Sequence, residues 1–306
     1  MTGSFSGVIP ILPTPFTERG EVDDEGFVRA IESSIADGVD GVAMLGLASE
    51  YYKLSDSERL RLVSHLVQRV GRRVSVIVSV VSHATKLAIA EAAMAVNAGA
   101  DALMIIPPFF LGPPIEATLQ HVRAVASAVQ VPIIVQYAPL QTGRPIEPDL
   151  FATLHREVPN ITHVKVDSVP SGRMIAALHA RNLQTLVGYM GLHLPADFRR
   201  GCNGVMPTVS LSSAFVKLWQ LLSQGNDQEA QLLHDDLLPL LTFMTQSIEL
   251  LIASEKRLLV RRGILTAAYC REPEYRLDSA ELAELEVHCL RLGKWLTPSV
   301  PNTGSI

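Results

Sequence analysis

The chain has 306 residues, of which 48% are hydrophobic and 19% charged, and its formal net charge is −5. A chain of this length buries roughly three quarters of its unfolded surface, so it needs neither a metal nor disulfides to hold its core together. The mildly acidic balance argues against nucleic acid as the main partner. Cys202, Cys270 and Cys289 form no C-x-x-C or histidine-spaced pattern, so neither a disulfide framework nor a zinc site is predicted.

The sequence also lacks targeting and membrane signals. Residues 1–5 contain no basic segment that leads into an apolar stretch, so we expect no signal peptide. No uninterrupted apolar run reaches the roughly 18 residues of a membrane-spanning helix. We therefore expect a soluble cytoplasmic protein without a membrane partner.

Short β-rich apolar runs alternate along the chain with longer segments of helical periodicity. In chain order, the predicted strands are Gly7–Thr14, Val42–Leu45, Val74–Val81, Ala102–Ile106, Pro132–Gln136, Ile161–Val166, Thr185–Gly188 and Gly204–Met206. The helices predicted to follow them are Asp24–Ala36, Ser55–Val70, Thr85–Ala98, Pro114–Val129, Pro148–Val158, Ser171–Ala180, Leu192–Arg200 and Leu211–Gln224. In the second helix, Ser55 and Glu58 have the spacing of a capping box.

Strict alternation of strands and helices predicts parallel strands, in either a closed barrel or an open sheet. Gly38, Gly99 and Gly201 each stand between a helix and the next strand, where a glycine suits the left-handed conformation that ends a helix. This recurrence favours equivalent turns around a barrel, and no glycine-rich dinucleotide motif follows the first strand. We therefore predict an α/β fold, a (β/α)8 TIM barrel.

The predicted barrel domain covers residues 1–225, and residues 226–306 form a C-terminal α-helical extension. The leucine-rich segment Asp227–Leu296 is expected to form two or three helices that pack on the barrel or on a neighbouring subunit. Residues 298–306 are polar and are expected to fray.

In such barrels, active sites lie at the C-terminal ends of the strands, and Lys165 near the end of the sixth strand is the most informative residue there. Strand alternation places Ile161, His163 and Lys165 on one face. Lysines are rarely buried without a function or a partner. A neutral lysine amine condenses with a ketone to give a Schiff base. The alternative is a structural salt bridge, to Asp167 or Glu50, and spacing alone does not decide between them.

Other candidates lie on the loops and strands beside Lys165. Glu50 is either a general base or, as we favour, a buried carboxylate that holds its loop together. Ser49 either binds a substrate carboxylate or caps the loop. Only one of Gln136 and Tyr137 faces the barrel interior, and Gln136 is the better candidate. His163 is interpreted as a satisfied core histidine. No phosphate-binding loop or metal motif is present.

Several segments together resemble the superfamily of dihydrodipicolinate synthase and N-acetylneuraminate lyase, which are Schiff-base aldolases and dehydratases. The resemblance spans nearly the whole chain, and its markers are Gly7–Pro10, Pro13–Phe16, Gly46–Glu50, Pro139–Gly143 and Val164–Ser168. It implies that Lys165 forms a Schiff base with a 2-oxo acid, with no other cofactor, and that the protein is a homo-oligomer, usually a tetramer. It also implies that Gly188 and Met206 line the substrate pocket.

The chain departs from the synthase pattern at the residues of its proton relay. The loop motif G-T-T-G-E is replaced by Gly46–Glu50 (G-L-A-S-E), and the strand-five tyrosine aligns with Gln136. A second tyrosine aligns with Phe109 or Phe110, and an arginine of the synthase aligns with Gln141. These departures predict that the protein is not a genuine dihydrodipicolinate synthase. The V-Q-x-A-P string that ends at Pro139 resembles instead the branch that contains L-2-keto-3-deoxyarabonate dehydratase.

The resulting hypothesis is a carbon–oxygen lyase that dehydrates a 2-keto-3-deoxy sugar acid. Lys165 forms the imine, a C3 proton leaves, and the C4 hydroxyl is expelled. Ser49 and the amides of the Ala48–Ser49 turn would hold the substrate carboxylate, and Gln136 would orient a water or a substrate hydroxyl. Two alternatives remain: an aldolase that releases or condenses pyruvate, and a non-catalytic protein that binds a 2-oxo acid.

Overall fold

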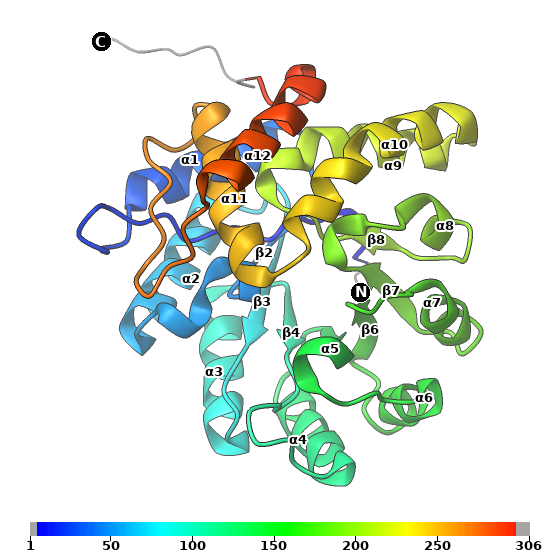
Figure 1. The fold of residues 1–306 in the computed structure, drawn as a ribbon. Coiled ribbons are helices and arrows are strands. Elements are labelled where there is room, and N and C mark those ends of the chain that lie inside the picture. The colour runs from blue at the N-terminus through cyan, green and yellow to red at the C-terminus, as the bar shows by residue number, and fades with distance from the viewer. Residues whose placement is uncertain (1–4, 298–306) are drawn as a thin grey trace.

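The computed structural model describes residues 5–297, and within them eight parallel strands form a ring that is surrounded by helices (Figure 1). Neighbours in the sheet follow the order β1-β8-β7-β6-β5-β4-β3-β2. The strands are β1 (Gly7–Val8), β2 (Gly41–Met44), β3 (Ser75–Val80), β4 (Ala102–Ile105), β5 (Ile133–Tyr137), β6 (Ile161–Val166), β7 (Gln184–Val187) and β8 (Gly204–Val205). The prediction of a (β/α)8 barrel with C-terminal helices is confirmed.

The ring closes through a short contact beyond the end of β1. Ile11 forms parallel bridges with both Ala43 of β2 and Thr208 after β8, and the Leu12 amide donates to the Ala43 carbonyl at 2.8 Å. The first strand is shorter than the predicted Gly7–Thr14 because Pro10 and Pro13 have no amide hydrogen to donate to a neighbouring strand.

The helices of the barrel alternate with the strands as predicted, with one addition. They are α1 (Asp24–Ala36), α2 (Asp56–Val70), α3 (Thr85–Ala98), α4 (Ile115–Ser127), α5 (Pro139–Thr142), α6 (Pro148–Glu157), α7 (Gly172–His179), α8 (Leu194–Phe198) and α9 (Ser212–Ser223). The capping box of α2 is present, because the Ser55 hydroxyl and the Glu58 carboxylate each accept the other residue's amide. The sequence did not predict α5, a single turn after β5.

The glycines between helices and strands adopt the predicted conformation. Gly38, Gly99 and Gly201 have φ angles of 85°, 105° and 87°, which L side chains rarely adopt. Each turn therefore sends the chain from a helix back into the barrel in the same way.

The interior of the barrel is filled by a layer of mostly apolar side chains from alternate strand positions. His163 lies within it: its ring packs edge-on against Phe5, and its Nε2 lies 3.2 Å from the Phe5 carbonyl oxygen. Burial lowers the pKa of His163 to about 4, so this histidine is neutral and structural. Apart from His163, the layer comprises Phe5, Ile9, Ile11, Ala43, Ile77, Ala102, Met104, Ile134, Leu186 and Met206.

One orientation in β6 differs from the prediction. Ile161 packs in the outer core between strands and helices, not on the interior face with His163 and Lys165. The pairing of β5 with β6 shifts register between Ile133 and Ile134, so strict alternation does not hold at the start of β6. The irregularity leaves His163 and Lys165 facing inward.

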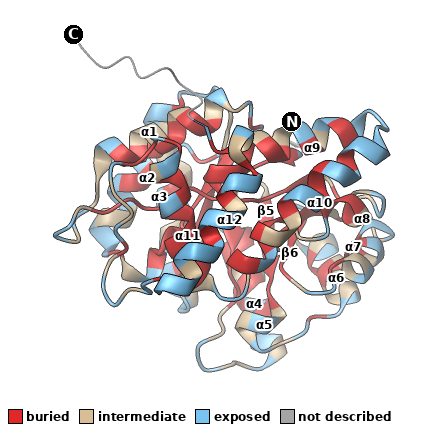
Figure 2. Ribbon diagram, turned by 45° about the horizontal axis from the view of Figure 1, so that its top comes forward, coloured by how far each residue is buried: buried red, intermediate tan, exposed pale blue. Residues whose placement is uncertain are grey.

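The C-terminal extension forms three helices: α10 (Asp227–Met244), α11 (Ile248–Arg261) and α12 (Ser279–Arg291). They lie together on one side of the ring, and α11 packs against the short turns η1 (Leu47–Ser49) and η4 (Val209–Leu211) at the strand ends (Figure 1). Buried positions on these helices face inward and exposed positions face out (Figure 2). The predicted fraying of residues 298–306 lies outside the described residues.

The described chain contains neither a helix that could span a membrane nor a cluster of metal-binding side chains. No helix within residues 5–297 is long and apolar enough to cross a membrane. In the same residues, no cluster of three or more His, Cys, Asp or Glu side chains could hold a metal ion.

Candidate active site

A cavity opens at the C-terminal ends of the strands, the end of a (β/α)8 barrel at which active sites lie. Its walls combine the strand ends, the loops that follow them and the corner between α10 and α11. The lining residues are Ile11, Gly46, Leu47, Ala48, Met104, Gln136, Gln141, Lys165, Asp167, Tyr189, Met190, Met206, Pro207, Thr208, Thr245, Gln246, Ser247, Ile248 and Leu251.

Lys165 reaches this cavity from β6. The side chain is almost fully buried, and in register it stands between Gln136 of β5 and Leu186 of β7. Its Nζ donates a hydrogen bond to Oδ2 of Asp167. The structure thus contains a salt bridge between Lys165 and Asp167, one of the two alternatives for Lys165. Both residues also line the cavity, where a ligand could reach the amine.

Asp167 is the centre of the polar contacts in the cavity. Its Oδ2 accepts from Lys165 and from Nε2 of Gln136 at 2.7 Å, and its Oδ1 accepts from the Tyr189 amide at 3.1 Å. Three donors on one buried carboxylate hold it in a single orientation. The sequence analysis considered Asp167 only as a salt-bridge partner, although residues 165 and 167 are two positions apart and share a face.

Gly188 provides the space that the Asp167 carboxylate occupies. A Cβ at position 188 would lie 1.8 Å from Oδ1 of Asp167, so no larger residue fits without moving that side chain. Gly188 itself is not among the cavity-lining residues, whereas Met206 is. Met206 thus lies in the cavity wall, and Gly188 acts on the cavity through Asp167.

The two neighbouring residues at the end of β5 point to opposite sides. Gln136 faces the cavity, and Tyr137 packs outward with its ring edge-on to Phe151 of α6. The Gln136 amide nitrogen is bound to Asp167, while its Oε1 is buried without a hydrogen-bond partner among the described residues. That oxygen is an acceptor that a ligand hydroxyl or a water could satisfy.

The loop after β2 places Ala48, but not the Ser49 hydroxyl, at the cavity. The Ser49 hydroxyl donates to the Leu12 carbonyl at 2.6 Å, and the Ser49 carbonyl accepts from the Thr14 hydroxyl at 2.7 Å. The Ser49 amide donates to Gly46 at 2.9 Å. The Ser49 side chain is therefore committed to the loop, as in the alternative in which Ser49 caps the loop. Leu47 and Ala48 start the turn, where amides lack acceptors within it.

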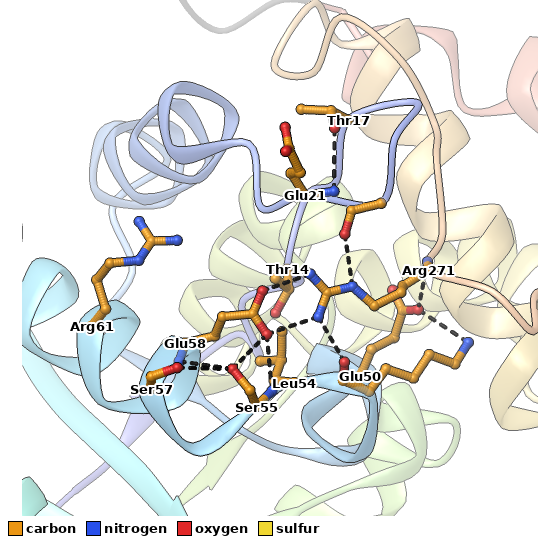
Figure 3. A network of polar contacts seen from close by, with 12 residues as sticks. Thr14, Thr17, Glu21, Glu50, Leu54, Ser55, Ser57, Glu58, Arg61 and Arg271 are labelled. Atoms are coloured by element: carbon orange, nitrogen blue, oxygen red, sulfur yellow. Dashed lines mark hydrogen bonds and ion pairs between the residues drawn. The ribbon is translucent and has the colours of Figure 1, made fainter.

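Glu50 lies outside the cavity and joins the loop to α11. It has a left-handed φ of 54°, and its carboxylate accepts from Lys256 of α11, from Lys53 at 3.2 Å and from the Arg271 amide at 3.3 Å. Figure 3 shows Arg271 beside this loop, where its guanidinium also binds both oxygens of Glu58. This is the arrangement of a buried structural carboxylate.

Two further parts of the cavity wall were not among the predicted site residues. Tyr189, immediately after β7, lies at the cavity, and its Oη accepts from Nε2 of Gln141 at 3.1 Å. The α10–α11 corner adds Thr245, Gln246 and Ser247 from the C-terminal extension. Tyr189 directly follows the predicted strand Thr185–Gly188, so the strand pattern already places it at this end of the barrel. No motif or periodicity indicates that the α10–α11 corner reaches the barrel mouth, because its placement depends on the tertiary fold.

The sequence model of the dihydrodipicolinate synthetase family matches residues 4–290. A protein named 4-hydroxy-tetrahydrodipicolinate synthase from Methanococcus vannielii is 32% identical over 240 residues, which cover 78% of this chain and 82% of the relative. The crystal structure of a dihydrodipicolinate synthase from Rhodopseudomonas palustris has a TM-score of 0.88 at 26% identity, covering 94% of this chain and 98% of the other.

YagE from Escherichia coli K12, described as a member of the dihydrodipicolinic acid synthase family in complex with pyruvate, has a TM-score of 0.86 at 25% identity. The match covers 95% of this chain and 99% of YagE.

These relatives correct one prediction. The sequence analysis excluded a genuine dihydrodipicolinate synthase because tyrosine and threonine residues of the relay are replaced. The exclusion is wrong, since relatives at 30–32% identity over about three quarters of the chain carry the synthase name. The chain belongs to the dihydrodipicolinate synthetase family.

Proposed function

We propose that the protein is a lyase that binds a 2-oxo acid as a Schiff base on Lys165. The observation that carries this proposal is the buried Lys165 amine at the cavity, hydrogen-bonded to a carboxylate that can accept its proton. Loss of that proton leaves the neutral amine, which is the nucleophile that attacks a C2 ketone. Family membership and the pyruvate bound to YagE support a 2-oxo acid as the ligand.

The reaction that we propose is dehydration of a 2-keto-3-deoxy sugar acid. The protonated imine on Lys165 withdraws electrons from C3, and Asp167 accepts the C3 proton to give an enamine. Expulsion of the C4 hydroxyl then completes the dehydration. The unpartnered Gln136 Oε1 would accept a hydrogen bond from a substrate hydroxyl. The Leu47 and Ala48 amides, in place of the Ser49 hydroxyl, would bind the substrate carboxylate.

The rest of the cavity wall supports a hydroxylated substrate tail. Among the lining residues, Lys165 is the single cation and Asp167 the single carboxylate. The remaining polar groups are neutral amides and hydroxyls, which suit the alternating donors and acceptors of a polyol chain. These neutral groups belong to Gln136, Gln141, Tyr189, Thr208, Thr245, Gln246 and Ser247.

A second candidate is an aldol reaction on the same imine, which either condenses pyruvate with an aldehyde or releases pyruvate from a longer 2-oxo acid. The synthase names of the relatives favour it. Both reactions share the enamine, and they differ in whether the C4–O or the C3–C4 bond breaks.

Product analysis separates the two reactions. The protein is incubated with five- and six-carbon 2-keto-3-deoxy sugar acids, and the products are followed by NMR and by a coupled assay for pyruvate. Dehydration predicts a new 2-oxo acid of unchanged carbon number and no pyruvate. Pyruvate together with an aldehyde would show an aldolase and contradict the dehydratase proposal.

We also propose that the barrel, residues 1–225, and the extension, residues 226–306, act as one catalytic unit within a cytoplasmic homotetramer. A single catalytic unit is supported by the α10–α11 corner of the extension, which lines the cavity of the barrel. The tetramer is supported by the family resemblance. Light scattering on the full chain measures the assembly, and a mass other than four chains would contradict a tetramer.

A further inference from the structure

We propose that Tyr189 is the acid that protonates the departing C4 oxygen of the substrate. This inference rests on the proposed dehydration and names the proton donor for it. The strand-five position at which the synthase pattern has a tyrosine is occupied here by Gln136, so the cavity has no phenol on β5. Tyr189 supplies a phenol from the turn after β7 instead.

The contacts of Tyr189 leave its proton free for a ligand. Oη accepts a hydrogen bond from Nε2 of Gln141 at 3.1 Å, so the phenol oxygen is held in place while its own O–H can donate elsewhere. The donated amide hydrogen also stabilises the phenolate that remains after proton transfer. At the other end of the residue, the Tyr189 amide donates to Asp167 at 3.1 Å. The proposed acid and the proposed base are thus linked through the backbone.

The backbone at Tyr189 adopts a conformation that the surrounding structure must impose. Tyr189, Met190 and Gly191 have successive φ angles of 45°, 55° and 67°. Two non-glycine residues in the left-handed region are strained, and such strain is found mainly at functional sites. The turn is fixed at Gly191, where a Cβ would lie 2.7 Å from the Phe215 ring and 2.9 Å from Val205. This geometry directs the Tyr189 ring into the cavity.

The other lining groups are less suited to the same step. Lys165 is bound in the imine, and Asp167 carries the proton that it took from C3. The hydroxyls of Thr208, Thr245 and Ser247 are much weaker acids than a phenol. Apart from Asp167, which is assigned to the proton at C3, Tyr189 is therefore the strongest acid among the described residues that line the cavity.

After Asp167 has removed the C3 proton, the nitrogen electron pair of the enamine forms the C2=N bond, the C2=C3 π pair moves to form the C3–C4 double bond, and the C4–O bond breaks. The phenol proton moves to the leaving oxygen, so that water departs and a phenolate remains. Hydrolysis of the conjugated iminium then releases the product and restores the Lys165 amine. Solvent returns a proton to Tyr189 and accepts one from Asp167.

The test compares two leaving groups in wild type and in Tyr189→Phe, with Tyr137→Phe as the matched control. Tyr137 is the neighbouring phenol of β5 that faces away from the cavity. The substrates are a 2-keto-3-deoxy sugar acid and its 4-deoxy-4-fluoro analogue, because fluoride departs with far less need for an acid. Water elimination is followed by NMR, fluoride release with an electrode, and imine formation by borohydride trapping with pyruvate.

We expect Tyr189→Phe to lose about 100-fold in kcat for water elimination, as typical for a general acid, with little change in KM. Fluoride release and trapping should stay close to wild type, and Tyr137→Phe should match wild type throughout. An equal loss of kcat for both leaving groups would show that Tyr189 has a merely structural role, and this would overturn the inference. An unchanged kcat for water elimination in Tyr189→Phe would overturn it as well. A wild type that traps no 2-oxo acid would overturn the proposed function, and this inference with it.

Discussion

Nε2 of Gln136 lies 2.7 Å from Oδ2 of Asp167, the same oxygen that accepts a hydrogen bond from the Lys165 amine. The amide therefore orients the carboxylate toward the lysine, and the carboxylate in turn fixes the amide so that Gln136 Oε1 remains open. Within this triad, Gln136 occupies the β5 position at which the synthase pattern has a tyrosine. Most of the functional predictions follow from it.

Replacement of Asp167 by asparagine removes the proposed base and keeps its shape. We expect the exchange of pyruvate methyl protons with D2O, followed by NMR, to slow by about 100-fold or more, a typical contribution of general base catalysis. Borohydride trapping should remain detectable. Asp197→Asn, at a buried carboxyl that does not line the cavity, serves as the control. Unchanged exchange in Asp167→Asn would show that another group removes the proton.

Gln136→Ala tests the orienting role of the amide. Loss of one substrate hydrogen bond and of the Asp167 contact should lower turnover of a sugar acid by about tenfold, which corresponds to roughly 1.4 kcal/mol. The yield of the borohydride-reduced adduct with pyruvate should stay near that of the wild type, because the Lys165 amine remains. If the adduct is lost as well, Gln136 is needed for imine formation and the proposed role is incorrect.

His163 predicts a dependence of stability on pH. Its pKa falls from an ordinary 6.5 to about 4 on burial, so the folded state binds fewer protons than the unfolded state between these values. Above pH 6.5, where His163 is neutral in both states, its burial costs no stability. As the pH falls toward 4, the unfolded state binds the proton first, and the free energy of unfolding decreases by a total of about 3 kcal/mol. Urea denaturation of wild type and His163→Gln should show a difference in unfolding free energy that shrinks on acidification. A difference that is constant with pH would refute this.

The buried pair of Glu50 and Lys256 should contribute strongly to stability. Both side chains are fully buried, and Lys256→Met leaves the carboxylate with only Lys53 and a backbone amide. We expect a loss of about 3–5 kcal/mol in the free energy of unfolding. The exposed pair Arg181–Asp149 is the control, since Arg181→Ala should cost less than about 1 kcal/mol. If denaturation experiments give comparable losses in the free energy of unfolding for Lys256→Met and Arg181→Ala, a structural role for Glu50 is contradicted.

The barrel could be predicted from the sequence because its signals are local. The capping box at Ser55 and the glycines between helices and strands act over a few residues, so the pattern of each segment reports its structure directly. Details that depend on pairing between strands were missed. The prolines after Val8 shorten β1, and the register shift beside Ile133 turns Ile161 outward.

The candidate site could be predicted only in part. Lys165 and Gln136 follow from strand alternation, and both face the cavity. The Ser49 hydroxyl binds the Leu12 carbonyl, a partner 37 residues away in the sequence. The strand pattern places Tyr189 at the end of the seventh strand, but nothing in the sequence singles it out as a site residue. The α10–α11 corner was missed, since only the assembled fold brings it to the barrel mouth. The identity of a residue does not reveal such long-range placement.

The most direct test of the account is borohydride reduction in the presence of pyruvate or a 2-keto-3-deoxy sugar acid, followed by peptide mapping with mass spectrometry. The account predicts a reduced adduct on Lys165, and no adduct in Lys165→Met, which should otherwise fold. An adduct on a different lysine, or none with any 2-oxo acid, would contradict the account and leave Lys165 and Asp167 as a structural ion pair.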